Sequence, residues 1–528
     1  MNKKIQVWLP LLLAIVMAIG MLAGYQLQHN LNWQNRTATR FTNANSSLQQ
    51  VMDLINYKYV DSMAIDSIES DGIEAVVNRL DPHSVYIPPA TLGEVNADLQ
   101  GNFSGIGIEY QMINDTLNVV YVLEKGPSDR AGIKTGDQLI KVDTINIAGS
   151  AKRGVDLRKY LRGKAGSKVQ VTVLHEGKSK VVEITRGNIP LPSLDAAYMA
   201  TPGIGYIRLN KFAETTYHEF MDAATGLQAK GMKKMILDLR GNGGGLLEQA
   251  TNIADELLAD GKVIVKTKGN HVKTREVISS KPGIFEQGEL VILLDEFSAS
   301  ASEVLAGALQ DNDRGTIVGR RSFGKGLVQE QYNLANGGAL RLTVARYYTP
   351  TGRSIQKPYT AGNNEKYREE ILDRFHNGDN YVTDTVHTTN FVTKGGKKLY
   401  DAGGISPDII IPFDSGTLPR AVAHLYGQNV LSDYVFNVFK EQRDVLRKYK
   451  SPAELGSEYN LPASTWQGLV GLAKQDSIQL GTISAKAKQD LELRMKALLA
   501  RYIWRNVGYF EVLNNNDSIY RKALEVLK

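Results

Sequence analysis

The fold of this chain is decided by one stretch of sequence, KMILDLRGNGGGLLEQATNIADELL, residues 234–258. An apolar run that we expect to be a strand, Lys234–Leu239, leads through a glycine cluster into a helix-like run, Leu246–Leu258. Glycines after a strand expose backbone N–H groups, which can cradle a phosphate or stabilise an oxyanion. The dinucleotide motif GxGxxG is not met, because its third glycine would fall on Leu246. A loop that merely needs several positive φ values is the plainer interpretation of Gly241–Gly245.

The same alternation of strands and helices continues on both sides of this stretch, which predicts an α/β fold. Residues 358–398 are polar and poorly patterned, as an inserted loop or lid would be, and residues 399–412 return to strand character. The other elements that we expect in this block are the strands Ile204–Leu209, Glu289–Leu294 and Thr316–Val318 and the helices Thr216–Ala229 and Ser300–Gln310.

A serine-rich segment, Ser298–Glu303, lies between the second of these strands and an apolar helix. Ser300 and Glu303 have the spacing of a capping box, so a helix N-cap is the plain interpretation. A serine at a strand-to-helix junction is also where a nucleophile can be exposed near helix N–H groups. Taken alone, the motif favours the cap.

A third motif, Gly319–Gly326, reads GRRSFGKG and is nearly a Walker A sequence. Gly326 replaces the Ser or Thr that would hold Mg²⁺, and Leu327–Tyr332 alternates like a strand where a P-loop requires a helix. Nucleotide binding is therefore disfavoured. A lysine between glycines, Lys325, instead suits a tight site in which burial lowers its pKa, so that it can act as a general base. A surface lysine is the alternative.

A separate block upstream carries short strand-like runs and the sequence Gly105-Ile106-Gly107-Ile108. Glycines followed by apolar residues let backbone N–H groups hold a chain-terminal carboxylate, while a strand edge accepts the peptide. Together with Gly126-Pro127, Ala131–Ile133 and Gly136–Ile140, this stretch resembles PDZ domains, which implies peptide binding through Gly105–Ile108. The strands expected here are Gly105–Tyr110, Leu117–Leu123, Gln138–Val142, Val169–Leu174 and Lys180–Thr185, with helical pieces at Asp129–Ile133 and 155–161.

Composition limits the chemistry of the 528 residues. The chain has no cysteine, which excludes disulfides, thiol nucleophiles, iron–sulfur clusters and cysteine zinc sites. It has eight histidines but no HExxH motif, so we expect no metal and no cofactor. The net charge of +6 is too small for this length to predict a nucleic-acid partner.

The N-terminus points to the cell envelope. Lys3 and Lys4 precede an uncharged stretch, Ile5–Gln28, that we interpret as an uncleaved signal-anchor helix, with a cleaved signal peptide as the alternative. The two lysines would stay in the cytoplasm, which places the rest of the chain in the bacterial periplasm, attached to the inner membrane unless the signal is cleaved.

The combination of the glycine loop, the SASASE helix start and the GKG strand is similar to the C-terminal processing, or tail-specific, peptidases. That family consists of Ser/Lys serine proteases with an inserted PDZ domain and a crotonase-related core. The resemblance spans about residues 48–412. It also rests on Leu80–Ser84 (LDPHS), Arg341–Arg353 and Gly403–Asp408.

The resemblance implies a role for each matching residue. Ser300 would be the nucleophile, Lys325 the general base, and Gln329 the residue that positions them. Ala301 and one glycine of 241–245, with Gly243 and Gly244 as candidates, would form the oxyanion hole. Asp311 would support activity, for which a surface helix end is the alternative, and Arg162 would link the PDZ domain to the core, unless it is only a solvated basic residue.

We divide the chain accordingly into a signal segment (1–28), a helical region (29–90), a PDZ domain (91–188), a peptidase core (189–414) and a helical region (415–528). The partners expected from the resemblance are proteins or peptides with exposed C-termini, the membrane, an adaptor protein and a second copy of the chain. Two other hypotheses stay open. One is a catalytically silent scaffold that binds C-termini, and the other is a crotonase-like acyl-CoA enzyme.

Overall fold

The computed structural model describes residues 46–113, 115–149, 156–377, 391–401, 403–413, 419–427 and 429–528. The chain forms two compact units, Met1–Ala75 and Val76–Lys528. The expected signal segment, residues 1–28, lies outside the described residues. Within the described ranges, no helix combines the length and the apolar character needed to cross a bilayer.

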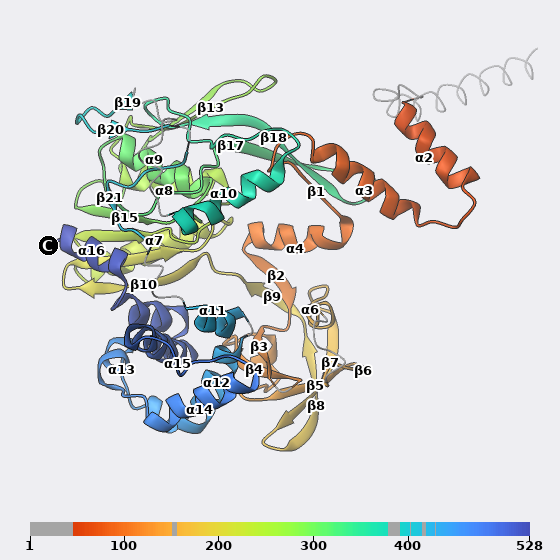
Figure 1. Ribbon diagram of the computed structural model, residues 1–528, viewed down its shortest axis with the longest axis vertical. Helices are drawn as coiled ribbons and strands as arrows, with labels where there is room; N and C mark the ends of the chain where they lie inside the picture. The colour runs from red at the N-terminus through yellow and green to blue at the C-terminus, as the bar shows by residue number, and fades with distance from the viewer. Residues whose placement is uncertain are drawn as a thin grey trace, which may run out of the picture. The chain divides into compact units, whose positions relative to one another are not determined.

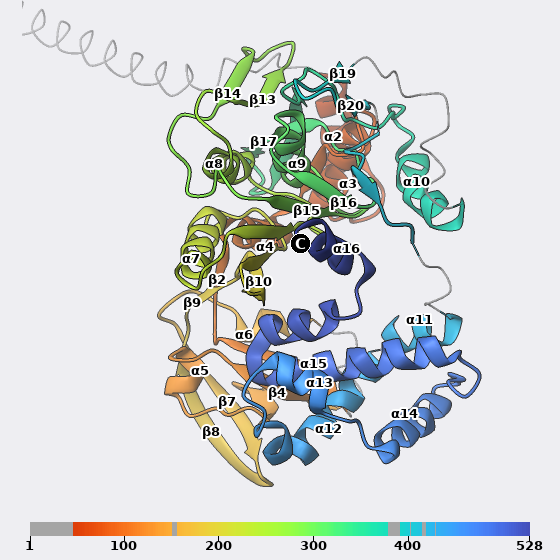
Figure 2. The ribbon, with the colours of Figure 1, turned by 90° about the vertical axis from the view of Figure 1, so that its left-hand side faces the viewer.

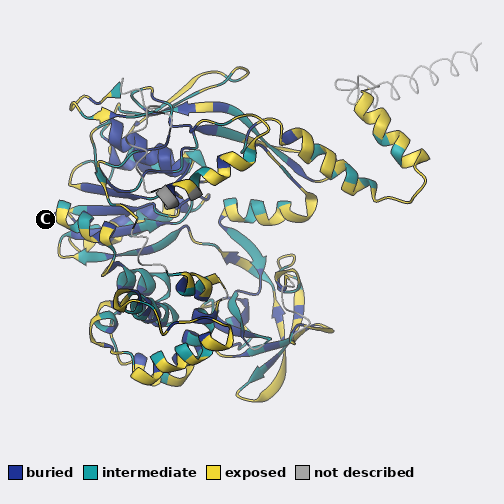
Figure 3. Cartoon of the chain, in the orientation of Figure 1, coloured by how far each residue is buried: buried dark blue, intermediate teal, exposed yellow. Residues whose placement is uncertain are grey.

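The first unit contains α2 (Ser47–Lys58) and most of α3 (Ile65–Val77), and both helices lie in the region 29–90 that we expect to be helical. Ser46 caps α2, because its side chain accepts a hydrogen bond from the N–H of Gln49 (3.2 Å). No residue of α2 is buried, as its yellow colour in Figure 3 shows.

The second unit is built on a six-stranded sheet in which β10 pairs antiparallel with β11 and all later neighbours are parallel. Parallel strands are covered on both faces, so they read as continuous apolar runs, as Lys234–Leu239 does. In spatial order the strands are β10 (Leu194–Thr201), β11 (Ile204–Leu209), β12 (Lys234–Asp238), β15 (Leu290–Leu294), β16 (Thr316–Gly319) and β21 (Ile409–Ile410).

Helices cover the two faces of this sheet. Alternate residues of a strand point to opposite faces. Leu237 of β12 thus packs in the core formed with α7 (Thr216–Ala229), α8 (Leu247–Leu257) and α9 (Ala301–Asp311), whereas Ile236 packs with the C-terminal helix α16 (Ser518–Val526). Every residue of α9 is buried, and the helix is dark blue in Figure 3.

A second sheet lies beside α9 and carries the lysine motif at the start of one of its strands (Figure 1). Its central strand, β18 (Ala339–Tyr348), pairs antiparallel with three neighbours. The strands around β18 are β1 (Val85–Ile87), β17 (Leu327–Asn333) and β13 (Val263–Lys268), and β14 (Arg275–Ile278) pairs with β13.

The PDZ block forms its own antiparallel sheet, with β3 at one edge. Strands β2 (Asn102–Gly105) and β9 (Gly187–Pro190) pair with each other at its entry and exit. The sheet order is β3 (Ile108–Ile113), β4 (Thr116–Val122), β5 (Gln138–Val142), β7 (Lys168–His175) and β8 (Lys178–Thr185), with β6 (Ile145–Asn146) on β5 and the short helices α5 (Pro127–Arg130) and α6 (Arg158–Leu161). The helix α4 (Pro89–Gln100) precedes β2.

The C-terminal region is helical, as expected, and Figures 1 and 2 show it beside β3 and β4 of the PDZ sheet. The longest helix among the described residues, α15 (Ala485–Asn514), is kinked, because Trp504 and Arg505 leave helical geometry. The other helices are α11 (Arg420–Gly427), α12 (Val430–Leu446), α13 (Pro452–Glu458) and α14 (Ala463–Gln475).

Two expectations for residues 358–412 are wrong. The polar segment 358–398 is not simply a loop, since it contains α10 (Asn364–Asn377) and the strands β19 (Phe391–Val392) and β20 (Lys398–Leu399). Charged side chains help to hold the helix in place, since Glu370 pairs with both Lys357 and Arg374. Strand character in 399–412 is confined to its ends, Leu399 in β20 and β21 (Ile409–Ile410).

Candidate active site

Ser300 lies at the turn between the buried strand β15 and the first residue of α9. Its backbone has φ 58° and ψ −113°, a conformation that is costly for a residue with a Cβ. Backbone strain of this kind persists only when the surroundings impose it, and it often marks a functional turn. The strand and the helix on either side of Ser300 supply that constraint.

Glu303, in the first turn of α9, ties this turn to the lysine loop. Its fully buried carboxylate accepts hydrogen bonds from the backbone N–H groups of Ser300 (2.8 Å), Lys325 (2.8 Å) and Gly324 (2.7 Å) and from the Ser322 hydroxyl (2.5 Å). Burial raises the pKa of Glu303, and these four donors act against that shift. The bond from Ser300 matches the capping-box spacing, whereas the bonds to residues 322–325 exceed what a helix cap requires.

Tyr347 of β18 forms a second set of hydrogen bonds that joins Ser300 to Lys325. Its hydroxyl lies within hydrogen-bond distance of the carbonyl oxygens of Ser300 (3.1 Å) and Lys325. The ring is buried. Ser300 and Lys325 are thus held together through their N–H groups by Glu303 and through their C=O groups by Tyr347.

The side chain of Lys325 is oriented by Gln329, four residues further along the chain in β17. The ammonium donates to Gln329 Oε1 (2.9 Å), and Gln329 Nε2 donates in turn to the carbonyl oxygen of His83. Burial, helped by the positive charge of Arg341, lowers the pKa of Lys325 to about 8, against the opposing effect of Glu303 and Asp81.

The segment Leu80–Ser84 therefore forms part of the same site. The Asp81 carboxylate accepts from the backbone N–H groups of His83 (2.9 Å) and Ser84 (3.0 Å), which fixes the turn that presents the His83 carbonyl to Gln329. The Thr343 hydroxyl of β18 also donates to Asp81 (3.0 Å). Burial lowers the pKa of His83 to about 4, and the charge of Lys325 adds to this shift.

The glycine loop lies against the serine turn. At Gly244, where φ is +97°, an added Cβ would sit 2.7 Å from the Ala299 carbonyl oxygen and 2.8 Å from Ser300 Cβ, so a side chain has no room there. The Gly244 N–H donates to Asn242 Oδ1 (2.9 Å). For the N–H of Gly243, the described residues provide no hydrogen-bond acceptor.

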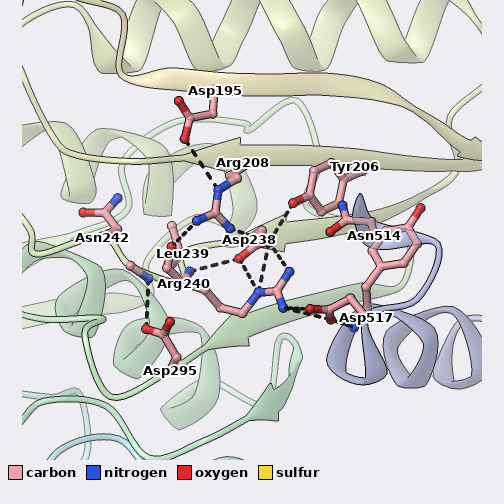
Figure 4. A network of polar contacts seen from close by, with 12 residues as sticks. Asp195, Tyr206, Arg208, Asp238, Leu239, Arg240, Asn242, Asp295, Asn514 and Asp517 are labelled. Atoms are coloured by element: carbon pink, nitrogen blue, oxygen red, sulfur yellow. Dashed lines mark hydrogen bonds and ion pairs between the residues drawn. The ribbon is translucent and has the colours of Figure 1, made fainter. Parts of the chain in front are cut away.

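A buried ionic network anchors the start of this loop (Figure 4). Asp238, at the end of β12, accepts from Arg208 Nη1 (2.8 Å), Arg240 Nη2 (2.6 Å) and the Tyr206 hydroxyl (2.6 Å). Arg240 also pairs with Asp517 at the start of α16 (2.8 Å). Burial alone would raise the pKa of Asp238, but the two guanidinium groups more than offset this and lower it. The sequence offered one signal for this network, a carboxylate inside the apolar run Lys234–Leu239.

Helix α10 packs on the loop that precedes Lys325. Arg374 donates to the Ser322 carbonyl oxygen (2.8 Å), and Lys357 pairs with Glu370 (2.9 Å). The Tyr367 hydroxyl reaches His83 Nε2 (2.8 Å). Polar contacts from the insertion therefore touch both segments that surround Lys325.

Two residues expected to support the site, Asp311 and Arg162, lie away from Ser300 and Lys325. Asp311 is at the far end of α9 from Ser300, where it forms a buried ion pair with Arg353 (2.8 Å). In the described part of the chain, no hydrogen bond or ion pair joins the Arg162 side chain to the peptidase core. It pairs with Glu94 of α4 (2.9 Å), and α4 in turn contacts the lysine strand, because Gln331 donates to Asn96 (3.0 Å).

The expected peptide-binding residues Gly105, Ile106, Gly107 and Ile108 line a cavity of about 420 Å³ between β3 and α6. This cavity belongs to the PDZ sheet and is separate from the Ser300 turn. In the part of the chain that the structure describes, no group of His, Asp and Glu residues is arranged to hold a metal ion.

Comparison with known proteins shows the class of this protein. The sequence model of Peptidase family S41 matches residues 203–363, that of the PDZ domain matches 104–185, and that of a family of unknown function matches 421–505. The chain thus combines a segment of Peptidase family S41 with a PDZ domain on a mixed α/β fold.

Relatives extend this match along the chain. A carboxy-terminal-processing protease of Bartonella bacilliformis is 36% identical over 58% of this chain and 71% of its own length. A probable CtpA-like serine protease of Staphylococcus aureus is 32% identical over 67% of this chain and 71% of its own length. Among solved structures, a photosystem II D1 C-terminal processing protease is 26% identical, covers 72% of this chain and 91% of its own, and has a TM-score of 0.36. The chain belongs to the carboxy-terminal-processing proteases of Peptidase family S41. The crotonase relationship of the core stays a prediction.

Proposed function

We propose that this protein is an endopeptidase of the cell envelope that binds the C-terminal tails of proteins through its PDZ domain. It cleaves them with Ser300 as nucleophile and Lys325 as general base. The observation that carries this proposal is the pair of hydrogen-bond sets, one from Glu303 and one from Tyr347, that join Ser300 to Lys325. Glu303 and Tyr347 hold together two backbone segments that are 25 residues apart (325 − 300).

The reaction begins with a proton transfer. Lys325 with a pKa of about 8 is uncharged in roughly a tenth of the molecules at pH 7, and its free amine takes the proton from Ser300 Oγ. The oxygen then attacks the carbonyl carbon of the scissile peptide bond. The tetrahedral intermediate collapses, the leaving amine takes the proton from Lys325, and an acyl-enzyme remains. Water, deprotonated by Lys325, attacks the ester and regenerates the Ser300 hydroxyl.

The intermediate needs hydrogen-bond donors for its oxyanion. The N–H of Ala301 at the start of α9 and the N–H of Gly243 supply them in this proposal. Gly243 is favoured over Gly244, because the Gly244 N–H already donates to Asn242. A close approach of the glycine loop to Ser300 is what such a hole requires, and Gly244 makes that approach possible.

Substrate delivery rests on the PDZ domain. Its edge strand β3 can accept a peptide as an added strand, and the glycine-rich start of the groove offers backbone N–H groups for the terminal carboxylate. A tail held at one end is thereby presented to the Ser300 site as an effectively intramolecular substrate.

The test compares variants of the full chain on a folded substrate protein that carries an unstructured C-terminal tail. Ser300→Ala and Lys325→Ala should each reduce cleavage by at least about a thousandfold, because the two groups act as one unit. Ser457→Ala and Lys448→Ala are matched controls, since both residues are exposed in the C-terminal helical region. The shortened substrate is measured by intact mass.

If either Ser300→Ala or Lys325→Ala is folded and cleaves the substrate as fast as the wild type, the proposed Ser300–Lys325 dyad is refuted. If the wild type never shortens the substrate but still binds its tail, the chain is a peptide-binding scaffold. The acyl-CoA alternative would require binding of coenzyme A, which the same protein sample can test by calorimetry.

A further inference from the structure

The PDZ groove has one wall that does not come from the PDZ domain. The cavity of about 420 Å³ is lined by β3, by Arg158 and Arg162 in and beside α6, and by Arg501 of the C-terminal helix α15. Arg501 belongs to the segment 421–505 that matches a family of unknown function. The groove that would receive a substrate tail is thus completed by a region outside the PDZ domain.

The PDZ sheet and the C-terminal helices contact each other through both apolar and polar side chains. Ile113 and Val120 of the PDZ sheet are buried in one apolar cluster with the C-terminal helices. The Tyr502 hydroxyl donates to Gln111 on β3 (3.3 Å). Apolar burial of this kind holds the C-terminal helices on the PDZ sheet. The bonds from Arg501, Tyr502 and Arg505 to β3 then place α15 beside the groove.

The ion pairs at this wall leave a surplus of positive charge. Glu109 on β3 is the carboxylate partner of two guanidinium groups, Arg501 (3.1 Å) and Arg505. Arg505 is held further by stacking over Tyr121, with 3.5 Å between its guanidinium carbon and the ring centre. At the other wall, Arg158 pairs with Asp156 and Arg162 with Glu94, so those charges are balanced.

Strand geometry determines which peptide residues would meet Arg501. In an antiparallel pair, residues opposite each other share a face of the sheet, and successive residues alternate. A tail whose end lies at Gly107-Ile108 would place its last side chain on the face of Ile108. Its second and fourth residues from the end would then share the face of Glu109 and Gln111, where Arg501 lies.

We propose that Arg501 is a specificity-determining residue that selects substrate tails carrying Asp or Glu at the second or fourth position from the C-terminus. The side chain of Arg501 is 34% exposed, so a peptide carboxylate can reach it. With such a tail bound, Arg505 remains paired with Glu109, and Arg501 pairs with the carboxylate of the peptide side chain. Each of the two guanidinium groups then has one carboxylate partner. This inference rests on the proposed function, because it requires tails to bind in the PDZ groove.

The experiment uses the full chain with Ser300→Ala, which binds without turnover. Three fluorescent decapeptides differ only in having Glu, Gln or Lys at both positions, and their binding is followed by fluorescence anisotropy at low salt. The Glu peptide should bind about fivefold more tightly than the Gln peptide, as expected for a partly exposed ion pair. The preference should weaken at high salt.

Variants of Arg501 separate charge recognition from a structural role. Arg501→Gln should abolish the preference while the Gln peptide binds as before. Arg501→Lys should retain it, and Arg501→Glu should make the Lys peptide the tightest. Arg447→Gln, which removes an exposed arginine of the same helical region, is the control and should behave like the parent.

Equal binding of the three peptides by the parent, or a preference that survives Arg501→Gln, would overturn this inference and leave the peptidase proposal intact. If none of the peptides binds, tail recognition by the PDZ groove itself fails, and the inference fails with it. Cleavage assays of the wild type then decide separately whether the Ser300 site is active.

Discussion

The proposed role of Lys325 depends on its burial. Burial and the nearby charge of Arg341 lower its pKa to about 8, whereas Glu303 and Asp81 act in the opposite direction. Since only the uncharged amine accepts a proton, kcat/KM for tail cleavage should rise as the pH increases through about 8 and level off above it. Initial rates measured on both sides of that pH, with the substrate below KM, give this profile.

The cause of the shift can be tested on the same assay. Arg341→Gln removes a positive charge that disfavours the ammonium form, so the midpoint of the profile should move to higher pH. Arg346→Gln, an exposed arginine on the same strand, is the matched control. A midpoint that stays in place in Arg341→Gln would show that the charge of Arg341 does not contribute to the pKa of Lys325.

At the scale of elements, the C-terminal helix α16 is joined to the glycine loop by charge. Asp517 pairs with Arg240, the residue directly before Gly241, and its side chain also accepts from the Tyr520 N–H (2.7 Å) as the N-cap of α16. Asp517→Asn keeps a good N-cap but removes the charge. We expect a loss of stability of about 1 kcal/mol, because the Asp517 side chain is 31% exposed, and a lower kcat for tail cleavage.

Thermal unfolding and the cleavage assay measure the two effects separately. Asp444→Asn, an exposed carboxylate of α12, should leave both unchanged. If Asp517→Asn lowers the unfolding temperature but leaves kcat at the wild-type value, α16 stabilises the sheet without affecting the catalytic loop.

Over the whole molecule, apolar patterning predicted the regular elements best. The strand Gln138–Val142, the strand Ile204–Leu209 and the helix Thr216–Ala229 have the bounds that their sequences indicate. These elements bury an apolar face in a core, so their periodicity is visible in the chain. Helix α10 was missed because its residues are mostly polar. Its contacts include a local ion pair, Glu370–Arg374, and a hydrogen bond from Arg374 to the distant Ser322 carbonyl oxygen, and neither produces an apolar periodicity.

The candidate site was likewise predicted only in part from the sequence. Family motifs led to Ser300, Lys325 and Gln329. In the structure Glu303 joins the backbones of Ser300 and Lys325, and the Lys325 ammonium donates to Gln329. The ties that hold them could not be read from spacing, because Glu303 had a sufficient local explanation as a helix cap and Tyr347 lies 47 residues from Ser300. The contact of Arg501 with the PDZ groove joins residues 392 positions apart and carries no local signal at all.

The most direct test of the central claim, that Lys325 activates Ser300, is the site and rate of labelling by a serine-directed fluorophosphonate. Peptide mapping by mass spectrometry should locate the label on Ser300 in the wild type. Labelling of Lys325→Ala should be about a hundredfold slower, as expected for loss of a general base. A label on another serine, or Ser300 labelled equally fast in Lys325→Ala, would contradict the account.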